Sequence, residues 1–184
     1  MEAVKEIKLN KIAKIILVAV LGTLLLTISA KIKIPFYPVP MTMQTFMVLF
    51  LGITLGPKIG LLTISLYLFE GIFGLPVFAG TPEKGIGLIY FTGPTMGYLI
   101  GFLVAVYFAG SFKYDKGIIN TFLKLIFSIS FVYILGMIWL GILIGWDKPI
   151  FKLGAQPFLL AELFKMLLLL FLTPTLLKVK KLIK

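Results

Sequence analysis

The sequence predicts an all-α membrane protein whose single domain covers residues 1–184. The chain is 60% hydrophobic and has a mean hydropathy of +1.09, so it is more apolar than a soluble domain. Apolar stretches of about 18 residues or more, the length that crosses a bilayer, recur along it. Lysines flank the first and the last of these stretches, which is the arrangement that the positive-inside rule describes.

Six membrane helices are expected from the apolar stretches and the breaks between them. They cover roughly residues 12–30, 42–55, 59–73, 94–110, 118–144 and 157–177. Three prolines within the segment 31–40 exclude helix there. "GPK" at residues 56–58 joins the second and third helices by a tight turn. The first apolar run is longer than the core of a signal peptide, and Ile28 is not the small residue that cleavage after Ala30 needs, so we expect no cleavage.

The lysines predict that both termini lie inside. With that orientation, twelve lysines fall on the inner side and five in the outer loops, and Lys165 lies within the sixth helix. The outer loops are rich in proline, glycine and aromatic residues, and the longest of them follows the third helix. Irregular backbone at membrane depth is tolerated only where protein or water satisfies its amides. We therefore expect the outer loops to fold over a ligand cavity.

Composition excludes several classes of function. The net charge of +11 comes from 18 lysines and no arginine, and its placement at the membrane helix ends indicates the lipid bilayer rather than nucleic acid as the partner. The chain has no cysteine and no histidine, which excludes disulfides, zinc sites and catalysis by these residues. It also contains no P-loop motif for ATP. We expect no metal, no cofactor and no enzymatic activity.

Three ionisable residues lie within or at the edge of the expected helices. Glu162 and Lys165 are three residues apart and share a helix face. They form either a plain ion pair or a ligand site with an acceptor beside a donor. Glu70 is interpreted as a solvated carboxylate at a helix end. The alternative is that it takes part in a proton relay.

Other candidates are polar, aromatic or small. Gln44 near the start of the second helix serves packing or ligand binding equally well. Phe78 and Tyr98 flank the long Gly/Pro segment and are candidates for a ligand wall. A stripe of small residues on the first helix packs within the bundle or docks a partner protein. The stripe consists of Ala19, Thr23 and Thr27.

Several segments resemble the BioY family, the biotin-specific S components of energy-coupling factor (ECF) transporters. "GLPVFAG" at residues 74–80 and "GPTMGYLIGF" at residues 93–102 carry the likeness most clearly. "IPFYPVPMTMQTF" at residues 34–46 and "LYLFEGIFGLPVF" extend it, and "PFLLAELFK" at residues 157–165 is similar to the family's segment near the sixth helix. The combination of motifs is more specific than any one of them.

The resemblance implies a six-helix S-component fold in a prokaryotic cytoplasmic membrane, with biotin bound under the outer loops. The implied partners are a transmembrane coupling subunit and two cytoplasmic ATPases. Glu162 would accept from a ureido N–H of biotin, and Lys165 would donate to the ureido oxygen. Phe78 and Tyr98 would contact the thiophane ring and the tail. Backbone around Gly80 and Thr95, water, or a loop lysine such as Lys84 would meet the carboxylate.

The chain departs from the family pattern at three places. Glu162 stands where the family commonly has aspartate, Thr81 replaces the second glycine of "VFAGG", and Met96 replaces a glycine. The tip from Thr81 to Lys84 therefore has no assigned role. Two alternatives remain, an S component for another vitamin and a small intramembrane enzyme that uses Glu70 and Glu162.

Overall fold

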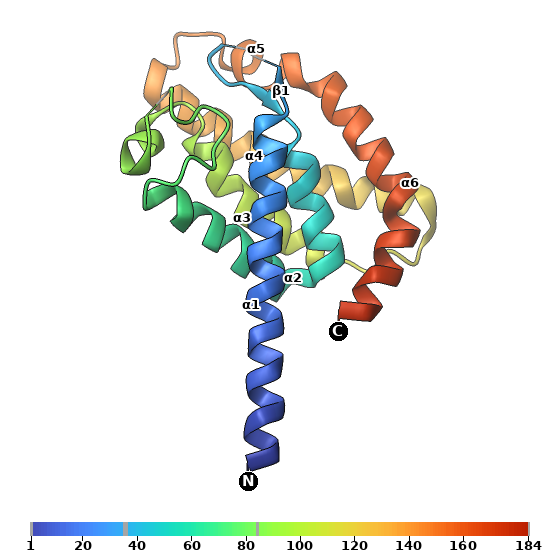
Figure 1. Cartoon of the computed structure of the whole chain (residues 1–184). Helices are drawn as coiled ribbons and strands as arrows, with labels where there is room; N and C mark the ends of the chain where they lie inside the picture. The colour runs from blue at the N-terminus through green and yellow to red at the C-terminus, as the bar shows by residue number, and fades with distance from the viewer. Residues whose placement is uncertain (1, 35–36, 84, 184) are drawn as a thin grey trace.

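The structure, a computed structural model, describes the backbone of residues 2–34, 37–83 and 85–183. Within these residues the chain is almost entirely helical (Figure 1). The α-helices are α1 (Glu2–Lys31), α2 (Gln44–Ile72), α3 (Met96–Ser111), α4 (Gly117–Ile144), α5 (Ile150–Gly154) and α6 (Leu159–Ile183). The remaining elements are the 3-10 helices η1 (Gly87–Thr92) and η2 (Gln156–Phe158), and the strands β1 (Lys33–Ile34) and β2 (Met41–Thr42).

The fold is an all-α membrane fold. Four of the described segments are long and apolar enough to cross a membrane, and α3 is a shorter apolar helix. The four segments are Lys11–Lys31, Gln44–Ile72, Gly117–Ile144 and Ile150–Leu182. Large apolar side chains remain exposed on the outside of the helices, for example Leu17, Phe171 and Ile118. Lipid solvates such side chains as readily as a protein core would.

Helix α2 is a hairpin of two antiparallel arms. Gly56 breaks the helix with a φ of 79° and a ψ of 176°, and Pro57 follows it. A Cβ on Gly60 would lie 3.7 Å from the Cα of Gly52, whereas eight residues of straight helix span about 12 Å. The side chains of Gln44 and Tyr67 also meet, at 2.9 Å. The two helices predicted over residues 42–55 and 59–73 are these arms, so that prediction is confirmed.

Close backbone contacts assemble the centre of the bundle, where α2 packs on α3 and α3 on α4. A Cβ on Gly52 would lie 2.8 Å from the carbonyl oxygen of Val106 and 2.9 Å from the Cβ of Ala109. Gly101 on α3 approaches the backbone of Val132 on α4 in the same way. Small residues define this interior because lipid provides no hydrophobic drive for helices to associate.

The two ends of the molecule differ in structure. The first turn of α1 and the last turn of α6 lie toward one side, and β1 and α5 lie at the opposite end (Figure 1). Among the described residues of the segment 31–40, residues 32–34 and 37–40 are non-helical as predicted, whereas Lys31 is the last residue of α1. The pairing of β1 with β2 as a two-residue ladder was not predicted. The sixth helix starts at Leu159 rather than at residue 157, because η2 precedes it, and the fourth starts at Met96 rather than at residue 94.

The small-residue stripe on α1 packs inside the protein. Ala19 and Thr23 are 1% and 2% exposed, and Thr27 is half-buried. The Thr23 hydroxyl donates to the Glu70 carboxylate at 2.9 Å, which ties α1 to the second arm of α2. Contact with α2 corresponds to the first of the two alternatives for the stripe, packing within the bundle. The partner-docking role of Ala19, Thr23 and Thr27 stays a prediction. Glu70 is likewise a hydrogen-bonded, half-buried carboxylate rather than a freely solvated one.

We expect Gly52→Ala to destabilise the protein, because the added Cβ meets the backbone of α3, which has no room to move. Overpacking of this kind costs about 1–3 kcal/mol. Thermal unfolding in detergent measures the effect, with Leu62→Val at an exposed position of α2 as the control. Equal stability of Gly52→Ala and the wild type would contradict the close α2–α3 contact.

Candidate functional site

A cavity of about 50 Å³ lies at the end of the bundle that holds β2, between the start of α2 and helices α3, α4 and α6. Its walls are mainly apolar and aromatic, with a few polar groups on one side. The lining residues include Val39, Thr42, Gln44, Thr45, Ala79, Tyr90, Thr95, Tyr98, Phe102, Tyr133, Phe158, Glu162 and Lys165. This composition, a largely apolar wall with few polar groups, is typical of sites for small molecules.

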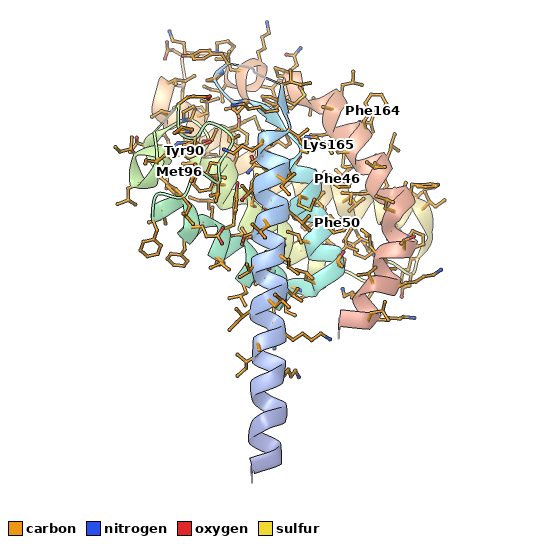
Figure 2. The ribbon with its side chains drawn as sticks, viewed as in Figure 1. Phe46, Phe50, Tyr90, Met96, Phe164 and Lys165 are labelled. Atoms are coloured by element: carbon orange, nitrogen blue, oxygen red, sulfur yellow. The ribbon has the colours of Figure 1, made fainter. Side chains whose placement is uncertain are left out.

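An ion pair between Glu162 and Lys165 forms the polar centre of this cavity. The ammonium lies 2.7 Å from Oε1 of the carboxylate, and the two residues are 4% and 8% exposed. They occupy the first turns of α6 and face the same way because they are three residues apart. Figure 2 shows Lys165 turned toward the bundle beside Phe164, which points away from it.

Strand β2 and the first turn of α2 complete the hydrogen bonding of the pair. Lys165 also donates to the carbonyl of Thr42 at 2.6 Å and to the hydroxyl of Thr45 at 3.0 Å. The Thr45 hydroxyl in turn donates to Oε1 of Glu162 at 2.8 Å. An ammonium carries three hydrogens, so these three acceptors use all of them. Tyr133 on α4 interacts with the Glu162 carboxylate from the opposite wall.

The orientation of the Gln44 amide is fixed by its partners. The Tyr67 hydroxyl donates to the carbonyl of Val77 at 2.9 Å, so it can only accept from Nε2 of Gln44. At the other end of the amide, the Thr42 hydroxyl donates to Oε1 at 3.2 Å. One N–H of Gln44 is committed in this way, which leaves its second N–H as a donor on the cavity wall.

Aromatic side chains form the apolar part of the wall. Tyr98 donates its hydroxyl to the carbonyl of Gly154 at 2.8 Å. Its ring fits between Gly136 on α4 and Gly154, and a Cβ on Gly154 would lie 2.6 Å from the hydroxyl. Tyr133 packs edge-on against Tyr98 and lies 6.4 Å from Phe158 between ring centroids. These contacts hold the three rings in place on the cavity wall.

Most of the residues singled out in the sequence converge on this cavity. Gln44, Thr95, Tyr98, Glu162 and Lys165 all line it. Two others lie outside the lining, Phe78 and Gly80. Phe78 is 1% exposed and packs under the outer loop against Tyr67 and Tyr90. Gly80 donates its N–H to the hydroxyl of Tyr90 at 3.3 Å.

Sequence reasoning missed three lining residues with clear roles in the site, Thr45, Tyr133 and Phe158. Thr45 follows Gln44 directly, so its place in "PMTMQTF" was a usable signal. Phe158 lies in "PFLLAELFK", so the motif that contains Glu162 and Lys165 was a usable signal for it as well. Tyr133 lies in a long apolar run that offers no such signal. Among the described residues, no group of three Asp, Glu, His or Cys side chains could hold a metal ion.

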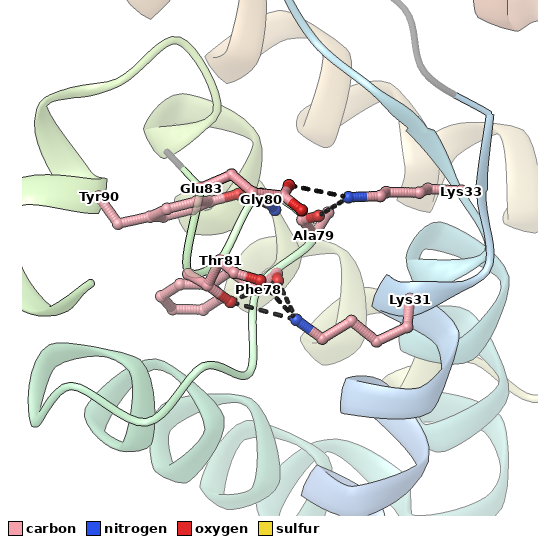
Figure 3. A network of polar contacts seen from close by, with 8 residues as sticks. All are labelled: Lys31, Lys33, Phe78, Ala79, Gly80, Thr81, Glu83 and Tyr90. Atoms are coloured by element: carbon pink, nitrogen blue, oxygen red, sulfur yellow. Dashed lines mark hydrogen bonds and ion pairs between the residues drawn. The ribbon is translucent and has the colours of Figure 1, made fainter. Parts of the chain in front are cut away.

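Two lysines fasten the loop from Phe78 to Glu83, called the outer loop here, which contributes Ala79 to the cavity wall (Figure 3). Lys31 donates to the carbonyls of Phe78 and Thr81 at 2.9 and 3.1 Å and to the Thr81 hydroxyl at 3.2 Å. Lys33 donates to the carbonyl of Ala79 at 2.9 Å and lies 3.5 Å from the Glu83 carboxylate. Burial raises the pKa of the Tyr90 hydroxyl beneath the loop, so this group stays protonated. Lys84, suggested above for a ligand carboxylate, lies outside the described residues.

The apolar helices and the buried, hydrogen-bonded ion pair on a cavity wall define a class, that of all-α membrane proteins with an internal polar site. Comparison with known proteins identifies the family. A model of the BioY family matches residues 3–182. The chain belongs to the BioY family.

Relatives and a solved structure agree with this assignment. The probable biotin transporter BioY of Pyrococcus horikoshii is 35% identical over 153 residues, which are 83% of this chain and 90% of that protein. The biotin transporter BioY of Thermotoga maritima is 34% identical over 145 residues, 78% and 84% of the two chains. A crystal structure of the S-component for biotin from an ECF-type ABC transporter matches with a TM-score of 0.73 and 25% identity, over 94% of this chain and 92% of that chain.

We expect removal of one partner of the buried ion pair to cost more stability than removal of both. Lys165→Met leaves the Glu162 carboxylate unpaired, which costs about 3–5 kcal/mol. The double variant Glu162→Gln/Lys165→Met removes the stranded charge and should unfold at a higher temperature than Lys165→Met alone. Thermal unfolding in detergent measures the unfolding temperatures of the two variants. A double variant that is less stable than the single one would show that the pair is not buried as described.

Proposed function

We propose that this protein binds biotin and takes it up across the cytoplasmic membrane as the substrate-specific S component of an ECF-type ABC transporter. The observation that carries the proposal is the buried set of Glu162, Lys165 and Gln44 on one cavity wall, in a chain of the BioY family. The relatives named as biotin transporters and the solved S-component for biotin support it. Since these relatives are named as transporters, the alternative of an intramembrane enzyme has no support.

The polar wall is complementary to the ureido ring of biotin, which offers N–H donors and one carbonyl acceptor. The Glu162 carboxylate accepts from a ureido N–H. Lys165 donates to the ureido oxygen, which replaces the Thr42 carbonyl or the Thr45 hydroxyl as one of its three acceptors. A site of buried polar groups rejects analogues that lack the matching group, because its own groups are then left unpaired.

The aromatic wall suits the less polar part of the ligand. The thiophane ring and the valerate tail contact Tyr98, and Phe78 supports this side from beneath the outer loop by its packing against Tyr90. The backbone near Gly80 and Thr95 lies where the tail leaves the cavity. Gln44 presents its second N–H beside the ureido ring and is a further donor to it.

The arrangement in the membrane follows from the helices and the lysines. We infer six crossings, by α1, the two arms of α2, α3, α4 and α6, with both termini inside and the outer loops over the ligand cavity. The first turn of α1 and the last turn of α6 lie toward the same side of the molecule, and lysines lie near both. This arrangement supports an orientation with both termini inside. The energy for uptake comes from partners, a transmembrane coupling subunit and two cytoplasmic ATPases, since the chain carries no P-loop.

A ligand panel tests the substrate. We expect the purified protein to bind biotin in a titration and to retain it through detergent extraction, and to bind neither thiamine nor riboflavin. Lys165→Ala should weaken biotin binding by at least about tenfold, or 1.4 kcal/mol. Lys152→Ala, at an exposed outer position, is the matched control.

Because Lys165→Ala also strands Glu162, Gln44→Leu provides a second variant that removes no charge. Equal retention of thiamine or riboflavin would exclude biotin as the specific substrate. Unchanged affinity in Lys165→Ala would show that the ureido assignment is wrong.

Cysteine labelling tests the topology, since the natural chain has no cysteine. A membrane-impermeant maleimide added to intact cells should label Lys148→Cys but neither Lys116→Cys nor Lys181→Cys. All three side chains are exposed on the protein surface, so differences in labelling report the side of the membrane on which each residue lies. Labelling of the latter two only after the membrane is opened completes the test, and the reverse pattern would overturn the inside orientation of the termini.

A further inference from the structure

The charges of the cavity do not balance once an anionic ligand enters it. Glu162 is the only carboxylate and Lys165 the only ammonium among the described lining residues, and they neutralise each other. Biotin adds one carboxylate. An unpaired charge at a partly buried position is unfavourable, so the carboxylate needs a cation near the cavity but outside its lining.

The chain restricts the choice to lysine, since it has no arginine and no histidine. Four lysines with described side chains lie near the outer end, and three of them are poor candidates. The three ammonium hydrogens of Lys31 are committed to three oxygens of the loop. Lys148 lies 3.0 Å from Asp147. Lys152 is exposed on α5 and does not line the cavity.

Lys33 differs from these lysines in place and in partners. Its ammonium donates to the carbonyl of Ala79 at 2.9 Å, and Ala79 is part of the cavity wall. Its backbone pairs with Thr42, another lining residue, so both side chains project from the same face of the β1–β2 ladder. The Lys33 side chain therefore lies at the edge of the cavity, as Figure 3 shows for its contact with the loop.

The acidic partner of Lys33 is easily replaced. The Glu83 carboxylate lies 3.5 Å from the ammonium, longer than a charge-assisted hydrogen bond, and its side chain is 74% exposed. Exposed pairs of this kind contribute little to stability. A competing carboxylate that approaches from the cavity would meet a cation whose present ion pair is weak.

We propose that Lys33 is the specificity-determining residue for the ligand carboxylate, which takes the place of Glu83 on its ammonium. This rests on the proposed function, because it assumes biotin in the cavity. Lys33 keeps its hydrogen bond to Ala79 and uses its remaining hydrogens for the ligand. Lys31 holds the loop in the position that makes this exchange possible, without contacting the ligand itself.

The proposal is tested by changing the charge on the protein and on the ligand in the same experiment. Affinities are measured for biotin and for biotin amide, whose tail is neutral, with the wild type and with Lys33→Gln. Glutamine can still donate to the Ala79 carbonyl, so the loop contact is kept. We expect Lys33→Gln to weaken biotin binding about tenfold and to leave the amide unchanged, so that the preference for the charged ligand disappears.

Glu83→Gln provides a prediction of opposite sign. Removing the competing carboxylate should strengthen biotin binding a few-fold and leave the amide unchanged. Raised salt should weaken the wild type's preference for biotin, because part of the interaction is exposed to solvent. Lys152→Gln is the control for a general loss of positive charge and should change neither affinity.

Three results would overturn the proposal. An equal loss of both ligands in Lys33→Gln would make Lys33 a residue that only holds the loop. Loss of the preference in Lys84→Gln but not in Lys33→Gln would assign the carboxylate to the other loop lysine. No change in either variant would leave the carboxylate without a lysine partner. If the wild type binds neither biotin nor biotin amide, the proposed function is rejected, and this inference is rejected with it.

Discussion

The ion pair between Glu162 and Lys165 is the interaction on which the rest of the site depends. Two opposite charges inside a membrane protein are tolerated only if each is paired and its remaining hydrogen bonds are made. The end of β2 and the start of α2 meet this requirement beside α6, since Thr42 and Thr45 supply the missing partners. The requirement also explains why the cavity forms there, because the same polar groups face its interior.

The hairpin of α2 connects this pair to the outer loop. Gly56 reverses the chain, so the two arms stand side by side and Gln44 meets Tyr67 across them. The hydroxyl of Tyr67 in turn donates to the carbonyl of Val77, at the start of the loop. The cavity wall, the second arm and the loop above them are thus joined by a continuous set of hydrogen bonds, which fixes the direction in which each polar group points.

The sequence predicted those features that depend on local spacing. Apolar runs gave the helices, proline and glycine gave their breaks, and the three-residue interval placed Glu162 and Lys165 on one face. Features that depend on contacts between distant segments were not predictable in this way. Tyr133 meets Glu162 only after α4 packs beside α6, and Phe78 is buried because Gly71 leaves room for its ring.

The fastening of the outer loop has a consequence for how this segment can change in evolution. Lys31 and Lys33 hold mainly backbone carbonyls, of Phe78, Ala79 and Thr81, rather than particular side chains. Every amino acid supplies the same carbonyl. The loop can therefore accept substitutions such as threonine at residue 81 without losing its anchorage. We therefore expect the loop to tolerate changes in its own side chains better than it tolerates the loss of either lysine, since the lysines supply the donors of the anchorage.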